Sequence, residues 1–380
     1  MLKGIYLTLL AGPLVPVPVP HVVLDALESV EITSTSELGV QSSFQLSFSF
    51  SLSNDSPLHT IFLLAGGGLV PFIRVVLVAT ISGIPEVLMD GVVTSQSVMP
   101  GGAGSRDSTL TIHGVDLSAL MDLVALDGMP YPAMPVEVRV ALILAKYLAF
   151  GIIPVPIPPL FLDIQNPLEG YAIHKGTDYT YLNHMAEEVG YVFYVDPGPA
   201  PGTSIAYFGP QIKIGVPQRA LNINMDAQTN CDELRFAFHS EKAKLPVVFI
   251  QNKETKIPIP IPIPNINPLQ PPLGLIEPIP KIIEFENGTA NLSPIRALSI
   301  GVAAASRSHD AVTADGSIDV IRYGGVLHAR GLVGVRGAGF AFDGLYYVES
   351  VTHKLKRGEY KQDFKLTRNG LVSITPRVPA

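Results

Sequence analysis

Proline at every second position is the feature that most limits how this chain can fold. From Pro258 to Pro264 the sequence reads PIPIPIP, and Lys256 to Pro280 holds nine prolines in 25 residues. Because proline lacks a backbone N–H and fixes φ, this segment can form neither a helix nor a central strand, and polyproline II is favoured. Two interpretations stay open. The segment is a stiff linker, or it is an extended arm on a neighbouring subunit, since isoleucines between the prolines would rarely be left in water.

Alternation of apolar and polar residues indicates that most of the remaining chain forms β-strands. From Phe44 to Ser51 every second residue is Phe or Leu and the others are Gln or Ser, a period typical of a strand with one buried face. Further strands are expected at Gly4 to Leu10, Phe72 to Ile81, Val87 to Val93 and Leu110 to His113. We therefore expect a first tube-like β domain over residues 1–125, closed by a short helix at Asp116 to Val124.

Residues 126–215 have a different pattern, and we expect a small α+β module there. One helix is predicted from Val136 to Phe150, after Pro135. Its buried stripe is expected to contain Val138, Ala141, Leu142, Ala145 and Leu148. A second helix is predicted from Asp178 to Val189, capped by Gly190. Short strands are expected at Tyr191 to Val195 and Ser204 to Phe208.

The remaining residues predict a second tube-like β domain, over 216–250 and 296–380, with a Pro-rich extended arm at 251–295 between its two parts. In the last expected strand, alternate residues share one face: Tyr360, Gln362, Phe364, Leu366 and Arg368. We expect Phe364 and Leu366 to face the core. The predicted fold class is therefore β-rich α+β, with two β-barrel domains and an α+β insertion.

Composition restricts the function. Only 16% of the residues are charged, against roughly 25% in an average soluble protein, and 47% are hydrophobic. This suggests extensive burial, within the chain or against partners. The net charge of −7 argues against a broad nucleic-acid-binding surface.

Prolines interrupt the uncharged runs Gly4 to Leu24 and Tyr147 to Leu162, so no membrane-spanning helix is predicted. Prolines also follow the apolar start of the chain in place of a cleavage site, so no signal peptide is predicted.

No catalytic, cofactor-binding or metal site is predicted. The lone Cys231 has acidic neighbours and is interpreted as structural. The helical segment His184 to Glu188 lacks the second histidine of a zinc motif. The glycine-rich run around Gly337 and Gly339 lacks the third glycine of the dinucleotide fingerprint. Ser306, Ser308, His309 and Asp310 cluster without a nucleophile elbow. The chain is therefore predicted not to be an enzyme.

A basic stretch lies near the C-terminus. Lys354 to Arg368 holds six basic residues against Glu359 and Asp363, an excess of +4 on an acidic chain. It is either a solvated strand face or a surface that steers an acidic partner.

The segment Val320 to Leu371 resembles the closing part of the phage late control gene D family, the baseplate hub proteins of contractile phage tails and related injection systems. The matching elements are Asp343 to Val348, Val351 to His353, Arg357 to Tyr360 and Phe364 to Gly370. Looser matches lie upstream, at Asp90 to Val92, Leu110 to Asp116, Thr177 to Tyr179, Tyr181-Leu182, Ala186 to Glu188 and Gly190 to Phe193. The Pro-rich segments depart from the family pattern.

This resemblance implies two tube-like barrels per chain and a homotrimer whose six barrels match one sixfold ring of the inner tube. The implied partners are the inner tube protein, a threefold spike and other baseplate components. Only nine residues follow Leu371, so the spike is expected to be a separate chain. The protein would be cytoplasmic during assembly and then part of a phage tail-like particle.

Two other interpretations remain. A membrane- or surface-associated β-rich structural protein would suit the mean hydropathy of +0.34. A spike-borne muramidase would need a catalytic carboxylate pair, which the sequence does not reveal.

Overall fold

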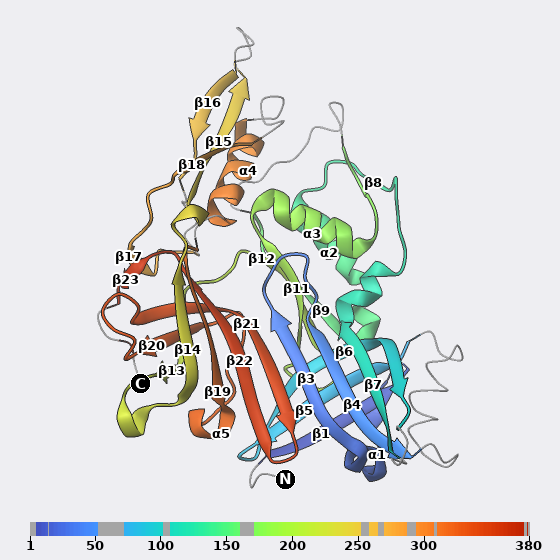
Figure 1. Cartoon of the computed structure of the whole chain (residues 1–380). Helices are drawn as coiled ribbons and strands as arrows, with labels where there is room; N and C mark the ends of the chain where they lie inside the picture. The colour runs from blue at the N-terminus through green and yellow to red at the C-terminus, as the bar shows by residue number, and fades with distance from the viewer. Residues whose placement is uncertain are drawn as a thin grey trace.

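The computed structural model describes residues 5–13, 15–51, 72–101, 107–159, 171–251, 258–264, 270–286, 294–307, 310–375 and 378. Strands dominate this part of the chain, so the β-rich prediction is confirmed (Figure 1). Within it, one large sheet contains thirteen strands.

The N-terminal half supplies seven strands of the main sheet. They are β1 (Ile5–Gly12), β2 (Val17–Pro18), β3 (Leu27–Thr35), β4 (Ser43–Ser51), β5 (Arg74–Ile81), β6 (Ile84–Met99) and β7 (Asp107–Asp116). Their order is β3-β4-β7-β6-β5-β1-β2, and every pairing is antiparallel. The predicted alternation in β4 is confirmed, because Phe44, Leu46 and Phe48 are buried. The expected short helix is a 3₁₀ helix, Leu117–Asp122.

The C-terminal half supplies the other six strands. They are β13 (Gln218–Asn222), β14 (Cys231–Phe238), β19 (Val312–Asp319), β20 (Leu332–Arg336), β21 (Gly344–Lys356) and β22 (Glu359–Arg368). The predicted face of β22 is confirmed: Phe364 and Leu366 are buried in the core of this half. In the hydrogen-bond pattern of the described residues, neither half closes into a barrel.

Strand β21 joins the two halves edge to edge. Its first residues, Gly344 to Tyr347, pair with β20, and its remainder, Ser350 to Lys356, pairs with β3. The other edge of β21 pairs with β22. One strand therefore belongs to both halves, and in Figure 1 the red and blue strands meet along it.

The α+β module packs against the main sheet. Its sheet contains β9 (Ile152–Pro156), β11 (Val192–Pro197) and β12 (Ser204–Gly209), and a two-stranded sheet pairs β8 (Pro130–Tyr131) with β10 (Ala172–Ile173). Its helices are α2 (Val136–Ala145) and α3 (Asp178–Val189). Gly190 caps α3 as predicted, with φ of 71°, and Ala303 lies so close that a Cβ at this position would clash.

The predicted stripe of α2 is wrong. Val138 and Leu142 are almost half exposed, and the buried residues are Arg139, Val140, Ile143 and Leu144. Val140, Ile143 and Leu144 also have helical i, i+3, i+4 spacing, and this alternative apolar stripe packs into the core of the module. Arg139 lies beside that stripe, and its Nη1 donates to the hydroxyl of Tyr181 at 2.7 Å. The expected helix also ends earlier, and Leu148–Phe150 forms a separate 3₁₀ turn.

A small three-stranded sheet projects from the molecule, and we call it the projecting sheet. It contains β15 (Lys244–Gln251), β16 (Pro258–Pro262) and β18 (Ile282–Phe285), and α4 (Pro294–Arg307) covers one face (Figure 1). The proline repeat is thus an edge strand rather than isolated polyproline II. Ile263 N donates to Pro246 O at 3.0 Å, so the isoleucines of the repeat direct their backbone N–H groups towards β15. The prolines, which have no N–H, occupy the positions whose backbone nitrogen points to the outer edge.

The remaining elements are short: α1 (His21–Ala26), α5 (Val320–Tyr323), the strand pair β17 (Gly274–Ile276) and β23 (Leu371–Ser373), and the 3₁₀ turns Asp226–Gln228 and Ser240–Lys242. Among the described residues, no helix combines the length and the apolar character needed to cross a membrane.

Candidate functional site

The three parts of the chain meet around one arginine, and we call this place the three-way junction. It consists of Arg330 from the C-terminal half, Thr35 and Ser42 from the N-terminal half, and Tyr194 and Asp196 from the α+β module. The side chain of Arg330 is 6% exposed. Its Nη2 donates to Thr35 O at 2.6 Å and to Ser42 Oγ at 3.1 Å. Its Nη1 donates to Asp196.

Arg330 also stacks on an aromatic ring. Its guanidinium carbon lies 3.9 Å from the ring centroid of Tyr194, a cation–π geometry. Arg330 has a φ of 66°, an uncommon conformation for a residue with a Cβ. Its N–H donates to Val348 O at 2.8 Å, which fixes the turn beside β21. The surrounding contacts therefore hold this residue in a costly backbone conformation.

A buried carboxylate, that of Asp116, lies beside the junction and hydrogen-bonds the backbone of one of its residues, Ser42. Asp116 accepts hydrogen bonds from Ser42 N at 2.8 Å and Ser118 N at 2.9 Å. Burial raises the pKa of Asp116, and these bonds and the charge of Arg330 oppose the rise. The carboxylate thereby positions Ser42, whose hydroxyl accepts from Arg330.

A second cross-link ties the α+β module to β5 and β6. Arg74 Nε and Nη2 donate to the two carboxylate oxygens of Asp90 at 2.7 and 2.6 Å. Arg74 Nη2 also donates to Gly202 O at 3.0 Å, and Ser204 Oγ donates to Asp90 at 3.4 Å. Burial raises the pKa of Asp90, while the bidentate bond from Arg74 opposes that rise. Both side chains are at most 5% exposed, so removing one partner would leave a buried charge.

The described residues that the sequence singled out lie in separate places in the structure. His184 lies on α3 and pairs with Glu188 at 3.8 Å. Cys231 is buried, and burial raises the pKa of its thiol to about 12. Ser308 and His309 lie outside the described residues, and Asp310 forms an ion pair with Lys213 at 2.7 Å. No group of three or more potential metal ligands occurs in the described part of the chain.

The basic stretch is largely engaged within the chain. Lys354 pairs with Asp363 at 2.5 Å, and Lys365 pairs with Glu349 at 2.8 Å. Arg368 is buried and donates to two backbone carbonyl oxygens at 2.9 Å. These contacts favour the interpretation of a strand face over that of a steering surface.

Sequence reasoning missed the residues of both cross-links. Arg330 and Arg74 are isolated arginines in apolar or glycine-rich sequence, and nothing around them shows what they contact. The single available signal was their charge, because an arginine within an apolar strand such as β5 needs a buried partner.

No protein-family model and no curated protein matches this chain. Solved structures do. The tail protein from Neisseria meningitidis MC58 matches with a TM-score of 0.63 at 14% identity, over 97% of this chain and 98% of that one. The 43 kDa tail protein of prophage MuSo2 from Shewanella oneidensis matches with a TM-score of 0.62 at 13% identity, over 96% and 98%.

A third structure comes from a secretion system. The E. coli c3393 protein is described as a component of the type VI secretion system with structural similarity to the T4 bacteriophage tail proteins gp27 and gp5. It matches with a TM-score of 0.52 at 11% identity, over 93% of this chain and 76% of that one. At these identities the likeness concerns the fold. The structural neighbours are thus tail and secretion-system proteins, as the resemblance to baseplate hubs predicted.

Proposed function

We propose that this chain is a structural baseplate hub of a contractile injection system or phage tail, which adapts a sixfold inner tube to a threefold spike. The observation that carries the proposal is the shared fold: a tail protein and a prophage tail protein match over nearly the whole length of both chains. In this role the chain transmits force and matches the symmetry of the tube to that of the spike, and it catalyses no reaction.

The proposed symmetry rests on the two β halves. Residues 1–125 would form one tube-like domain, and residues 216–250 with 296–380 the other, so three chains would offer six similar domains to the tube. The pairing of β3 with β21 fixes one half against the other. The Arg330 and Arg74 cross-links fix the α+β module to the same frame. A frame linked in this way suits a part that must keep its shape under load.

The mass of the purified assembly tests the stoichiometry. Native mass spectrometry is expected to give a complex of three copies of the 40.7 kDa chain. Image reconstruction of the particle should place this trimer between the tube and a separate spike chain. Six copies per ring, or a position away from the tube axis, would contradict the proposal.

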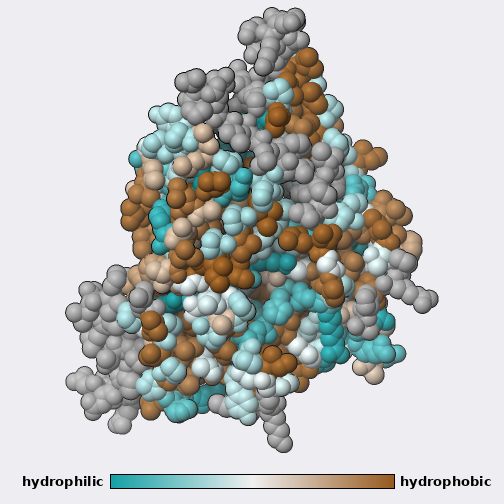
Figure 2. Space-filling model, turned by 180° about the vertical axis from the view of Figure 1, so that it is seen from behind, coloured by the Kyte–Doolittle hydropathy of each residue, from teal (hydrophilic) through white to brown (hydrophobic). Residues whose placement is uncertain are grey.

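The projecting sheet is proposed to contact a neighbouring subunit or another baseplate chain. It exposes large apolar side chains to solvent, including Ile259, Ile283 and Phe285, each about half exposed. Figure 2 shows hydrophobic surface at the top of the molecule, where this sheet projects. Limited proteolysis is expected to cleave residues 251–295 in the isolated chain and to spare them in the particle. Equal cleavage in both states would leave the segment as a linker.

A further inference from the structure

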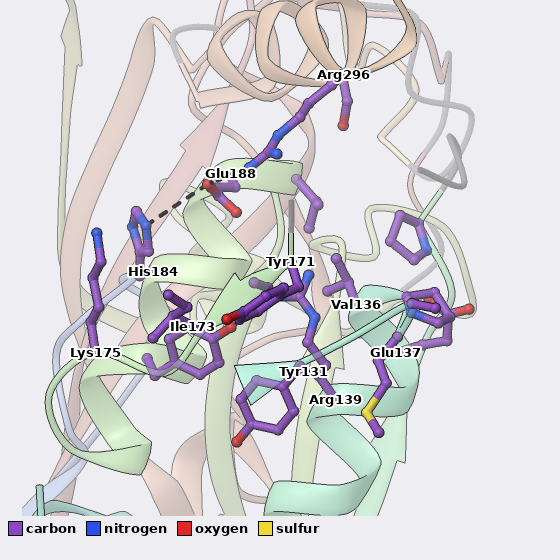
Figure 3. Close-up of a pocket in the computed structure, with 18 of the residues that line it drawn as sticks. Tyr131, Val136, Glu137, Arg139, Tyr171, Ile173, Lys175, His184, Glu188 and Arg296 are labelled. Carbon is purple, nitrogen blue, oxygen red and sulfur yellow. Dashed lines mark hydrogen bonds and ion pairs between the residues drawn. The ribbon is translucent and has the colours of Figure 1, made fainter. Parts of the chain in front are cut away.

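A cavity of about 350 Å³ lies in the α+β module, between α2, α3, α4 and the β8–β10 pair. Figure 3 shows its wall, with Arg139 and Glu137 from α2 and His184 and Glu188 from α3. Arg296 reaches it from α4 and pairs with Glu188 at 3.3 Å. The volume lies within the usual range for sites that hold a small ligand or a short peptide segment.

The cavity contains a buried arginine that has no anionic partner among the described residues. Arg139 is 9% exposed, and its one hydrogen bond to a described residue is from Nη1 to the hydroxyl of Tyr181. Its Nε is buried without a hydrogen-bond partner among those residues. A buried guanidinium is costly unless a carboxylate or a comparable group accepts from it, and its planar fork suits a carboxylate.

A second polar atom in the same cavity is also unsatisfied. Glu137 Oε2 is buried and accepts no hydrogen bond in the described part of the chain. Glu137 and Arg139 are two positions apart on α2, so their side chains diverge and do not pair. The cavity therefore presents a donor that needs an acid and an acceptor that needs an N–H.

Besides the ionisable side chains of Lys175, His184, Glu188 and Arg296, the wall has an aromatic and apolar part. The rings of Tyr131 and Tyr181 are stacked, with centroids 5.9 Å apart and planes at 10°. Tyr171 and Ile173, each about half exposed, also line the cavity. Such a wall suits an apolar side chain with polar groups beside it.

We propose that this cavity binds an acidic peptide segment of a partner polypeptide. A peptide offers all three complementary groups together: a carboxylate for Arg139, a backbone N–H for Glu137 and an apolar side chain for the tyrosines. A dianionic phosphate would satisfy Arg139 but offers only acceptors, so it would leave Glu137 Oε2 without a donor. The proposal rests on this cavity alone and does not depend on the trimer.

Isothermal titration calorimetry of the full chain tests it with two blocked dipeptides, acetyl-Phe-Asp-amide and its neutral isostere acetyl-Phe-Asn-amide. The acidic dipeptide is expected to bind at least about tenfold more tightly, because a hydrogen bond to a charged group is lost with the isostere. Arg139→Gln should abolish this preference. Arg235→Gln is the matched control, since Arg235 is exposed on β14 and does not line the cavity.

A second variant covers the case in which Arg139→Gln fails to fold. Ser299→Trp fills the cavity from α4 and leaves Arg139 in place, and it should also abolish binding. Equal affinity for the two dipeptides, or binding by neither, would overturn the proposal. So would binding of free phenylalanine in preference to both dipeptides.

One competing occupant lies in the chain itself. Residues 160–170, which connect the cavity residues Pro159 and Tyr171, lie outside the described residues and carry Asp163 and Glu169. If their carboxylates satisfied Arg139, the double variant Asp163→Asn with Glu169→Gln would bind the acidic dipeptide at least tenfold more tightly than wild type. That result would overturn the proposal of a partner peptide, whereas unchanged affinity supports it.

Discussion

The three-way junction and the projecting sheet differ in which side chains they bury and which they expose. At the junction a charged side chain, Arg330, is buried and fully engaged by three parts of the chain. In the projecting sheet apolar side chains such as Ile283 and Phe285 remain in solvent. The first region is held internally, and the second exposes the kind of surface that is usually covered by a partner. The chain thus separates the part that keeps its shape from the part that is open to contact.

The same substitution, made in the buried core of the C-terminal half and in the projecting sheet, should give the largest contrast. Phe364 is buried in the core of the C-terminal half, so Phe364→Ala is expected to lower the free energy of unfolding by about 3–5 kcal/mol. Phe285→Ala in the projecting sheet should cost less than about 1 kcal/mol, because Phe285 is 56% exposed. Urea denaturation of both variants measures the difference. Equal losses would show that the projecting sheet belongs to the same cooperative core.

Removing the arginine of the junction should have the next largest effect. Arg330→Met leaves the buried Thr35 carbonyl and the Ser42 hydroxyl without their donor, and about 1.5–3 kcal/mol of stability is expected to be lost. Arg235→Met is the matched control, because its side chain is 79% exposed and paired only at the surface. A junction that matters little to stability would give two indistinguishable denaturation midpoints.

The folded chain should also lose stability in mild acid, because of one buried histidine. His353 on β21 is buried beside the hydroxyl of Tyr360, and burial lowers its pKa to about 3. The unfolded chain takes up a proton near pH 6.5, but the folded chain does not do so until about pH 3. Its contribution to stability is therefore complete above pH 6.5 and is lost as pH falls from there towards 3.

Stability curves at several pH values can isolate this effect. Between pH 6.5 and 5.5 the wild type is expected to lose about 1 kcal/mol more than His353→Gln, which has no such proton to bind. Parallel curves for the two proteins would show that His353 titrates normally in the folded state.

The smallest effect is expected at the proline edge. Pro260→Ala should change stability by less than about 1 kcal/mol, mainly through the unfolded chain. Ile261→Pro should cost more, because Ile261 lies at a position that faces β15 and contributes its N–H to the ladder. If the two variants were equally stable, the assigned direction of the strand would be wrong.

Local sequence patterns predicted much of the fold. The strand at Phe44 and the buried face of β22 followed from period-two alternation, since one face of each packs on a core. Helix α3 and its glycine cap followed from local signals as well. The stripe of α2 did not, because the helix is apolar on two faces, and the face with Val140, Ile143 and Leu144 is the one that packs into the core.

Non-local pairings could not be predicted in the same way. The β3–β21 ladder joins residues more than 300 positions apart, and no turn or spacing links them. The proline repeat correctly excluded a helix and a central strand, but it could not show that β15 would supply a partner strand. The cavity was equally hidden, because Glu137 and Arg139 read as ordinary residues of an amphipathic helix.

The outward-facing prolines of β16 make the projecting sheet one-sided. Strand addition needs N–H donors along an edge, and here Pro258, Pro260 and Pro262 remove the outward donors. The opposite edge, β18, contains no proline, and no described strand pairs with it there. Any β-augmentation of this sheet is therefore directional: a guest strand can dock beside β18, while fibrillar stacking through β16 is blocked. Several copies of the projecting sheet can then lie close together with their apolar side chains exposed, and the β16 edge will not start amyloid-like growth.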